Sequence, residues 1–296
     1  MMVVLLFGSS GLVGSSIRAH LNLDFLHLFI YTRANDLLCI RNGLPHLVES
    51  NLSLSHSLRL AKPDIIINAA GSTKNRAQIV ESNIFFVSKL LFAISSYSLL
   101  NSKHIHFFQI SSLGAADPHS FVQQHELNFY EISKKLSDLF ILSVAKPYSN
   151  LHVSFIQPSI VFSCSHTSFL KKLFFLFLLS PLRFDSHDFV IPLVPVDVIS
   201  RFIVTSVCSS SFHSPNLFVP LTSGQTLSEI HSIFLRHSSL YRILNRFKFS
   251  SPSFLHFIAH SKLQHLLPAK ILSIPSSAFR RSIIRLYLYP TSLLLR

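Results

Sequence analysis

The chain has 296 residues, of which 49% are hydrophobic, so it can bury a sizeable core in one two-lobed domain or in two domains. Its 26 Lys and Arg against 13 Asp and Glu give a net charge of +13, which suits phosphorylated substrates, an anionic membrane surface or nucleic acid. Because the charges are scattered and no aromatic-interleaved basic motif accompanies them, we do not expect nucleic acid as a partner.

The first predicted element is a buried strand at residues 3–7, followed at once by a glycine-rich turn. Gly8, Gly11 and Gly14 lie in FGSSGLVG, and apolar residues then recur at helical spacing over residues 12–21. At the start of a dinucleotide site, Gly8 would allow the tight turn, Gly11 the approach of a pyrophosphate, and Gly14 close helix–strand packing. An ordinary strand-to-helix turn is the alternative interpretation.

Strand and helix patterns alternate along the first half of the chain. Further strands are predicted at 27–32, 45–50, 64–70, 104–110 and 151–158, with helices at 75–99 and 122–146. This alternation predicts an α/β fold, namely a Rossmann-type doubly wound parallel sheet with a smaller C-terminal substrate lobe. We therefore expect a dinucleotide-binding domain at 1–160 and a mainly substrate-binding lobe at 161–296, partly interleaved with the sheet.

Ligands of such sheets bind beyond the carboxyl ends of the strands, so the residues just after each strand are the candidates for a site. The strand at 64–70 ends in Asn68, Ala69, Ala70 and Gly71, whose small side chains would let a cofactor lie against the backbone. The next strand is followed by Ser111 and Ser112, and the one after it by Gln157 and Pro158.

Tyr130 and Lys134 lie four residues apart in NFYEISKKLSDLF, so a helix places them on one face. A tyrosine is a poor acid or base at neutral pH, but a neighbouring ammonium favours the phenolate. We expect Lys134 to lower the pKa of Tyr130 and to bind a cofactor ribose, while Ser112 orients the substrate. A half-buried helix tyrosine beside a surface lysine is the alternative.

Taken together, the segments GSSGLVG, NAAG, SSLG, YEISK, QPSIVFS and VPVD resemble the short-chain dehydrogenase/reductase superfamily, in its extended or atypical branch, over residues 3 to about 200. The resemblance implies a Rossmann fold, NAD(P), and catalysis by Tyr130, Lys134 and Ser112. It also matches Asn83 and Asp197 to family residues, although helix packing explains Asn83 equally well, and we expect Asp197 to cap the helix that follows it.

The choice of cofactor depends on the end of the second strand. Arg33 stands where an acidic residue would bind the ribose of NAD, so NADP is expected, while Asp36 keeps NAD open. The expected cofactor-binding residues are Gly8, Ser10, Gly11, Leu12, Val13, Gly14, Arg33, Asn68, Ala69, Ala70, Gly71, Lys134 and Pro158.

Three functions fit these observations. The first is an epimerase, dehydratase or ketoreductase of a nucleotide-linked sugar, for which the basic charge suits a diphosphate substrate. The second is an NADPH-dependent reductase of an acyl or lipid-like substrate, suggested by the Phe- and Leu-rich second lobe. The third is a non-catalytic NADPH-binding scaffold subunit. QPSIVFS lacks the Arg, Tyr and Gly usual in sugar-nucleotide enzymes, which leaves the substrate class open.

The remaining composition bears on location and partners. Cys39, Cys164 and Cys208 are widely spaced and odd in number, which predicts a reducing cytoplasm, and neither they nor the 17 histidines form a metal-binding pattern. The apolar run at 173–179 is too short to span a bilayer. The late segment around Arg280 alternates basic and apolar residues, so peripheral contact with the inner membrane face stays open beside a packed C-terminal helix. A homodimer also stays open.

Overall fold

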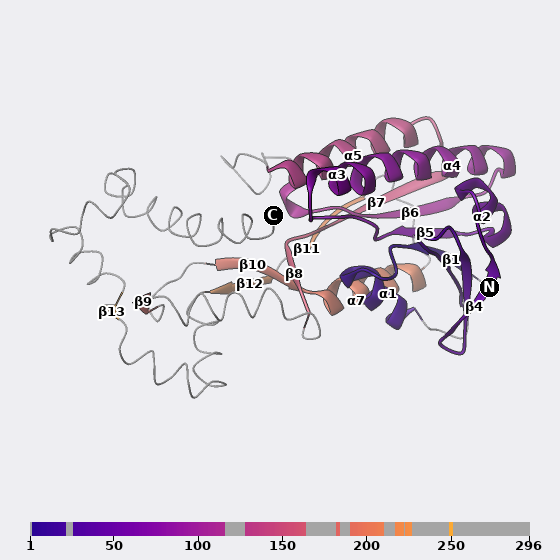
Figure 1. Ribbon diagram of the computed structural model, residues 1–296. Coiled ribbons are helices and arrows are strands. Elements are labelled where there is room, and N and C mark those ends of the chain that lie inside the picture. The colour runs from indigo at the N-terminus through magenta and orange to yellow at the C-terminus, as the bar shows by residue number, and fades with distance from the viewer. Residues whose placement is uncertain are drawn as a thin grey trace. The chain divides into compact units, whose positions relative to one another are not determined.

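The computed structural model describes residues 2–21, 26–115, 128–163, 182–183, 190–209, 217–221, 223–226 and 249–250 (Figure 1). The chain divides into two compact units. The first comprises Met1–Ser163 and Val194–Thr222, and the second comprises Cys164–Leu193 and Ser223–Arg296.

The first unit is built on an eight-stranded sheet in the order β11-β7-β6-β5-β1-β2-β3-β4. Neighbouring strands from β11 to β2 pair in parallel. The strand order reverses at β1, which pairs with β2 on one side and with β5 on the other. The strands are β1 (Met2–Phe7), β2 (Leu26–Tyr31), β3 (Leu37–Arg41), β4 (Leu44–Glu49), β5 (Ile65–Asn68), β6 (Ile105–Ile110), β7 (Leu151–Pro158) and β11 (Leu217–Leu221).

Helices cover both faces of this sheet (Figure 1), which confirms the predicted Rossmann-type fold. Residues of α1 and α7 share one buried cluster, and residues of α2, α4 and α5 share the other. The helices are α1 (Leu12–His20), α2 (Leu54–Ala61), α3 (Arg76–Ile79), α4 (Phe86–Asn101), α5 (Phe129–Ala145) and α7 (Val196–Cys208), with a π-helix η1 (Val80–Phe85) and a 3-10 turn η2 (Leu113–Ala115).

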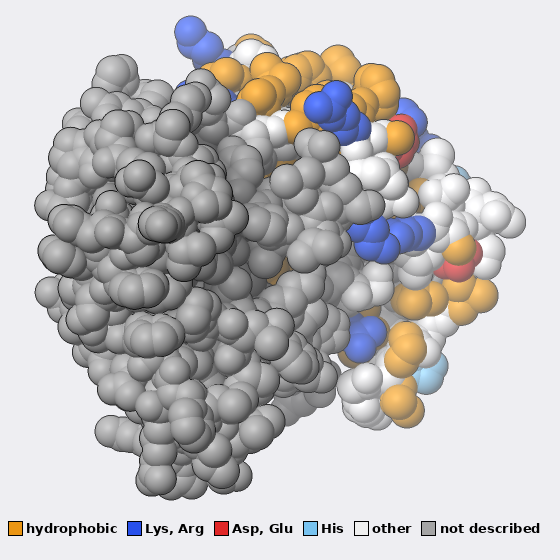
Figure 2. Space-filling view, turned by 60° about the vertical axis from the view of Figure 1, so that its left-hand side comes forward, with side chains coloured by type: hydrophobic (Ala, Val, Ile, Leu, Met, Phe, Trp, Pro, Cys, Tyr) orange, Lys and Arg blue, Asp and Glu red, His pale blue; other side chains and the backbone are white. Residues whose placement is uncertain are grey.

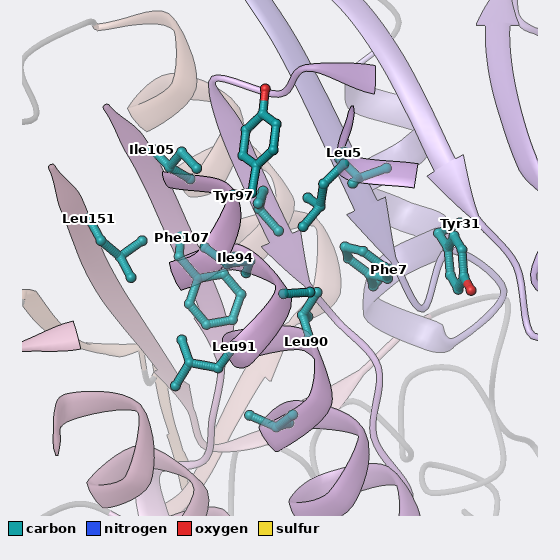
Figure 3. Packing of buried hydrophobic residues seen from close by; sticks show 14 of the residues in the cluster. Leu5, Phe7, Tyr31, Leu90, Leu91, Ile94, Tyr97, Ile105, Phe107 and Leu151 are labelled. Carbon is teal, nitrogen blue, oxygen red and sulfur yellow. The ribbon is translucent and has the colours of Figure 1, made fainter. Parts of the chain in front are cut away.

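The two buried clusters follow from the alternation of side chains along a strand. On β1, Leu5 and Phe7 face the cluster of α2, α4 and α5, whereas Val4 and Leu6 face the cluster of α1 and α7. Figure 3 shows the first cluster, in which Phe107 of β6 lies among leucine and isoleucine side chains of α4. A strand buried on both faces reads as a continuous apolar run, which is why residues 3–7 could be recognised from the sequence.

The helical stretch Arg76–Asn101 is long and apolar enough to cross a membrane by length and composition, yet half of its most apolar window is buried inside the protein. Val87, Leu90, Leu91 and Ile94 have no exposed surface and belong to the cluster of Figure 3. The apolar character of this helix is therefore explained by burial against the sheet.

The strand predicted at 45–50 is present at the edge of the eight-stranded sheet, but it does not pair in parallel. It forms β4, which pairs antiparallel with β3, and β3 in turn pairs antiparallel with β2. Asn42 and Gly43 connect β3 to β4 with positive φ angles of 50° and 76°. Asn-Gly is the strongest short signal for a two-residue hairpin, and it was available in the sequence.

Helices α4 and α5 expose several large apolar side chains. In Figure 2, hydrophobic side chains gather along the top of the described part, the side on which Figure 1 places these two helices. The exposed residues include Phe92 and Leu100 on α4 and Leu136 and Leu139 on α5. The homodimer stays a prediction, since no partner chain is part of the structure.

Residues of the second unit form two strand pairs, of which the second involves the first four residues of β10 (Val190–Pro195). β9 (Leu182–Arg183) pairs in parallel with β13 (Phe249–Ser250), and β10 pairs antiparallel with β12 (Ser223–Thr226). β8 (Ile160–Phe162) follows β7 in the first unit. The basic–apolar segment at 280–296 and Cys164 lie outside the described residues.

Candidate dinucleotide and catalytic site

The three glycines of the first turn meet three different steric demands. Gly8 has a φ of +77°, and a Cβ there would lie 2.5 Å from the carbonyl carbon of Ala69. A Cβ at Gly14 would lie 2.7 Å from the carbonyl carbon of Gly8. At Gly11, by contrast, the nearest atom would be the Gly8 oxygen at 3.4 Å. Gly8 and Gly14 are therefore required by the fold, whereas the open space at Gly11 suits a ligand.

Helix α1 begins directly after Gly11, the glycine that has open space around it. Gly11 is its N-cap, no side chain caps the helix, and its first turn contains no acidic residue. Its first-turn N–H groups lack intrahelical acceptors and carry the positive end of the helix dipole, which favours an anion. Ser10 and Gly11 are exposed, whereas Leu12 and Val13 are half-buried, so these residues offer backbone groups rather than side chains.

The segment after β5 is shaped by a buried asparagine. The Asn68 amide group donates to Gln109 Oε1 at 2.8 Å, and its oxygen accepts from the Ala70 N–H at 3.1 Å. Asn68 has no exposed surface. Its side chain therefore holds the loop in shape, and Ala69 and Ala70, which are half-buried, lie against Gly8.

Gly71 brings this loop next to α5. A Cβ at Gly71 would lie 3.1 Å from Asn83 Oδ1 and 3.2 Å from Lys134 Nζ. Asn83, buried in the π-helix η1, accepts from the Ser72 N–H at 3.0 Å and donates to Ser133 Oγ at 3.0 Å. The glycine turn, the Asn68–Gly71 segment and α5 are thus successive neighbours in space.

The helix predicted at 122–146 is present as α5, whose N-cap is Asn128. Asn128 and Glu131 form a capping box: the Glu131 N–H donates to Asn128 Oδ1 at 3.0 Å, and the Asn128 N–H donates to Glu131 Oε2 at 2.9 Å. This fixed start places Tyr130 in the first turn and Lys134 one turn later. Lys134 is only 4% exposed, and its ammonium donates to the Ile110 carbonyl at 2.8 Å.

Ser112 and Tyr130 form a side-chain hydrogen bond, so the predicted orienting hydroxyl and the predicted acid–base residue do come together. Ser112 Oγ also accepts from the Gly114 N–H at 3.3 Å. Gly114 in turn packs against Glu131, since a Cβ there would lie 2.5 Å from Glu131 Oε1. The loop after β6 is therefore fitted closely to the first turn of α5.

The electrostatics of Tyr130 differ from the expectation. Burial, together with the charges of Glu131 and Asp138, raises the pKa of Tyr130 to about 12, and the hydrogen bond with Ser112 opposes this rise. The expected lowering of the Tyr130 pKa by Lys134 is therefore wrong for this structure. The physical reason is that burial and two carboxylates outweigh the Ser112 hydrogen bond, while the Lys134 ammonium is bound to the Ile110 carbonyl.

Two functional candidates escaped the sequence analysis, Glu131 and Asp138. Asp138 is 4% exposed and accepts a short hydrogen bond from Ser111 Oγ. Burial raises the pKa of Asp138 to about 7, and burial lowers the pKa of Lys134 to about 8, a shift that the Asp138 charge opposes. An acid four residues after Lys134, on the apolar face of a helix, was the signal available in the sequence.

Other predicted positions lie at the edges of this arrangement. Arg33 is exposed in the turn after β2, while Asp36 accepts from the Thr32 hydroxyl at 3.5 Å. Within the described ranges Arg33 forms no ion pair, which leaves its guanidinium available. Pro158 is buried at the carboxyl end of β7, paired in register with Leu221.

The proposed N-cap role of Asp197 is wrong. The N-cap of α7 is Pro195, and Asp197 lies in the first helical turn, where it accepts from Ser16 Oγ at 3.3 Å. Ser200 Oγ donates to the same Ser16 hydroxyl at 2.8 Å. Asp197 thus joins α7 to α1.

Among the described residues, no group of three or more His, Cys, Asp or Glu could hold a metal ion.

Comparison with known proteins agrees with this geometry. The model of the NAD dependent epimerase/dehydratase family matches residues 4–181. Among solved structures, the chain resembles a UDP-glucuronic acid 4-epimerase from Bacillus cereus in complex with NAD (TM-score 0.58, 16% identity, 80% of this chain and 84% of that chain). No curated protein matches the sequence.

Two further solved structures have a similar fold. One is a dTDP-4-dehydrorhamnose reductase from Clostridium acetobutylicum (TM-score 0.56, 13% identity, 84% and 83% of the two chains). The other is RMD from Pseudomonas aeruginosa complexed with NADPH (TM-score 0.54, 17% identity, covering 80% of this chain and 82% of that chain).

Proposed function

Because the chain belongs to the NAD dependent epimerase/dehydratase family, we propose that it is an NAD(P)-dependent enzyme whose substrate is a nucleotide-linked sugar. One observation carries this proposal: Gly8 lies against Ala69, and two residues further along the same loop Gly71 lies against Lys134. This arrangement brings a turn that fits a pyrophosphate next to a helix that carries a tyrosine and a lysine.

The residues present fit a dinucleotide. The open space at Gly11 and the uncapped N-terminus of α1 would hold the pyrophosphate, and Lys134 beside Gly71 would hold a ribose hydroxyl. When bound, the nicotinamide supplies a hydride acceptor or donor. The remaining chemistry is proton transfer, which falls to side chains of this chain.

Tyr130 is the proposed proton-transfer residue and Ser112 its partner. With a pKa of about 12, the Tyr130 phenol keeps its proton at neutral pH, so it is set to donate to a substrate oxygen as a carbonyl is reduced. Removal of a proton from a substrate hydroxyl needs the phenolate, which Ser112 stabilises by its hydrogen bond. We therefore expect the reductive direction to work at neutral pH and the oxidative direction to gain rate as the pH rises.

Three features support the finer parts of the proposal. The net charge of +13 favours a substrate that carries a diphosphate. The exposed Arg33 at the end of β2 favours the 2′-phosphate of NADP over NAD. Cys39 and Cys208 are free thiols, in keeping with a reducing compartment, and we propose the cytoplasm.

A ligand screen by thermal shift with NAD, NADP, UDP-sugars, dTDP-sugars and acyl-CoA tests the proposal, followed by turnover assays with the ligands that stabilise the protein. Stabilisation by a nucleotide-linked sugar in the presence of dinucleotide is expected. Stabilisation and turnover with acyl-CoA alone would instead establish the lipid-like alternative.

Tyr130→Phe is the decisive variant. Tyr148→Phe is its matched control, because Tyr148 lies beyond the C-terminal end of α5 and packs against the hydrophobic core. We expect Tyr130→Phe to abolish turnover while it retains dinucleotide affinity, and Tyr148→Phe to retain both. Full turnover by Tyr130→Phe would remove Tyr130 from the mechanism. Absence of turnover by the unmodified protein with every ligand that stabilises it would leave the scaffold function as the better account.

A further inference from the structure

Four buried polar side chains lie together around Asp138, next to Tyr130 and Ser112 of the proposed site. Lys134 and Asp138 come from α5, Ser111 from the loop after β6, and Gln157 from the end of β7; each is at most 4% exposed. Ser111 Oγ donates to Asp138 Oδ2, and the charge of Asp138 is further stabilised by Gln157 and by Lys134. The function proposed above uses Lys134 but none of the other three.

The end of β6 attaches to α5 at two successive positions. The Ile110 carbonyl accepts from Lys134 Nζ at 2.8 Å, and the adjacent Ser111 hydroxyl donates to Asp138, one helical turn further along. This double attachment fixes how far Lys134 can extend. It leaves the ammonium next to Gly71, at the loop where we place the dinucleotide.

Stability alone does not explain this cluster. Two buried opposite charges lose about as much free energy by desolvation as they gain by attraction, and apolar side chains of similar size often serve a fold equally well. Here the lysine needs a nearby carboxylate, because burial disfavours its ammonium form and Asp138 is the charge that favours it.

We propose that Asp138 is a positioning residue that holds the Lys134 ammonium charged and in place beside Gly71, supported by Ser111 and Gln157. This inference rests on the proposed function, in which Lys134 binds the cofactor ribose. The groups that face Asp138 are Lys134 and Tyr130 on its own helix, Ser111 at the end of β6 and Gln157 on β7.

The proposal makes the protonation of Lys134 depend on Asp138. Burial lowers the pKa of Lys134 to about 8, and without the Asp138 charge this pKa falls further. Asp138 itself has a pKa of about 7, so the two charges coexist mainly between about pH 7 and pH 8. Because the groups interact, these midpoints belong to the pair as well as to each residue.

The test is an NMR titration of the full chain labelled with 13C-lysine, without cofactor or substrate. The Lys134 Cε signal is assigned by its loss in Lys134→Arg. We expect its midpoint to fall by about one pH unit in Asp138→Asn. Glu131→Gln is the matched control, because Glu131 lies on the same helix but does not influence the pKa of Lys134.

An unchanged Lys134 midpoint in folded Asp138→Asn would overturn the proposal. If Asp138→Asn does not fold, Ser111→Ala replaces it. Loss of the Ser111 hydrogen bond raises the pKa of Asp138, so we expect a smaller fall of the Lys134 midpoint. An unchanged midpoint in Ser111→Ala would also overturn the proposal. NADPH affinity gives the second measurement. It should weaken in Asp138→Asn at about pH 8 and approach that of the unmodified protein at about pH 6.

These two measurements separate the inference from the proposed function. If the midpoint shifts but no dinucleotide binds to any variant, the coupling of Asp138 to Lys134 stands and the proposed function fails. If Asp138→Asn binds NADPH as tightly as the unmodified protein does at both pH values, the positioning role is excluded while the proposed function survives.

Discussion

Ser111 and Ser112 are consecutive residues whose hydroxyls serve two different residues of the same helix: Ser111 donates to Asp138, and Ser112 hydrogen-bonds to Tyr130. One dipeptide at the end of β6 thus supports both the lysine side and the tyrosine side of the site. The two serines can therefore be separated by mutation.

Ser112→Ala should raise the pKa of Tyr130 above its present value of about 12, because the hydrogen bond with Ser112 is what favours the phenolate. A hydrogen bond to a charged group contributes about 1.5–3 kcal/mol, so the oxidative reaction should slow about tenfold or more. Turnover of a nucleotide-linked sugar over a range of pH measures this. Unchanged oxidation rates would show that Ser112 does not act on the phenolate.

Glu131→Gln should have the opposite effect on the same group. The Glu131 charge raises the pKa of Tyr130, so its removal lowers that pKa and moves the alkaline transition to lower pH. Gln can still complete the capping box with Asn128, so the helix start is kept. The tyrosinate absorbance near 295 nm, taken as a difference from Tyr130→Phe, gives the midpoint directly. Glu131→Ala, which also loses the cap, is expected to cost about 1 kcal/mol of stability.

The parts of the molecule that follow from local rules could be predicted from the sequence. The strand at 3–7, the tight turn at Gly8 and the close approach of Gly14 to the end of β1 depend on residues near them in sequence, and the structure confirms them. The β3–β4 hairpin is also encoded locally, in Asn42-Gly43.

The electrostatics of the site could not be predicted in this way. The pKa of Tyr130 depends on how deeply α5 is buried and on where Glu131 and Asp138 point, which only the folded chain determines. The same holds for Asp138, since its partner Ser111 is 27 residues away in sequence. A motif names the residue types of a site, whereas tertiary packing sets their proton affinities.

Arg33→Ala should change the preference between the two dinucleotides. Arg33 is exposed at the end of β2, and an arginine there would pair with the 2′-phosphate that distinguishes NADP from NAD. We expect NADP affinity to fall about tenfold or more while NAD affinity stays unchanged. Fluorescence titration with NADPH and NADH measures both. Tenfold tighter binding of NADH than of NADPH by the unmodified protein would contradict the assignment.

His106 should make the protein sensitive to acid. It is 6% exposed, its Nε2 lies 2.8 Å from Ser154 Oγ, and its ring stacks on Phe108. Burial, and then the charge of His152, lowers the pKa of His106 from 6.5 to about 4. The unfolded chain therefore takes up this proton at a higher pH than the folded one, so stability is lost as the pH falls from about 6.5 to about 4.

The free energy of unfolding, measured with urea, should be about 3 kcal/mol lower at about pH 4 than at neutral pH because of His106. His106→Leu should lose less stability over the same interval, while the exposed His27→Leu should behave as the unmodified protein. An acid response identical in His106→Leu and the unmodified protein would assign the sensitivity to other groups.

Gly11→Ala and Gly14→Ala should separate cofactor binding from folding. A Cβ at Gly11 would be 3.4 Å from the nearest protein atom, an ordinary contact, so Gly11→Ala should keep its melting temperature. It would occupy the space in which the pyrophosphate approaches α1, so NADPH affinity should fall sharply. A Cβ at Gly14 would overlap the Gly8 carbonyl group at the end of β1, so Gly14→Ala should be destabilised by more than about 2 kcal/mol. Differential scanning calorimetry and NADPH titration of both variants measure the contrast. Retention of NADPH affinity by a stable Gly11→Ala variant would show that the dinucleotide does not bind at this turn.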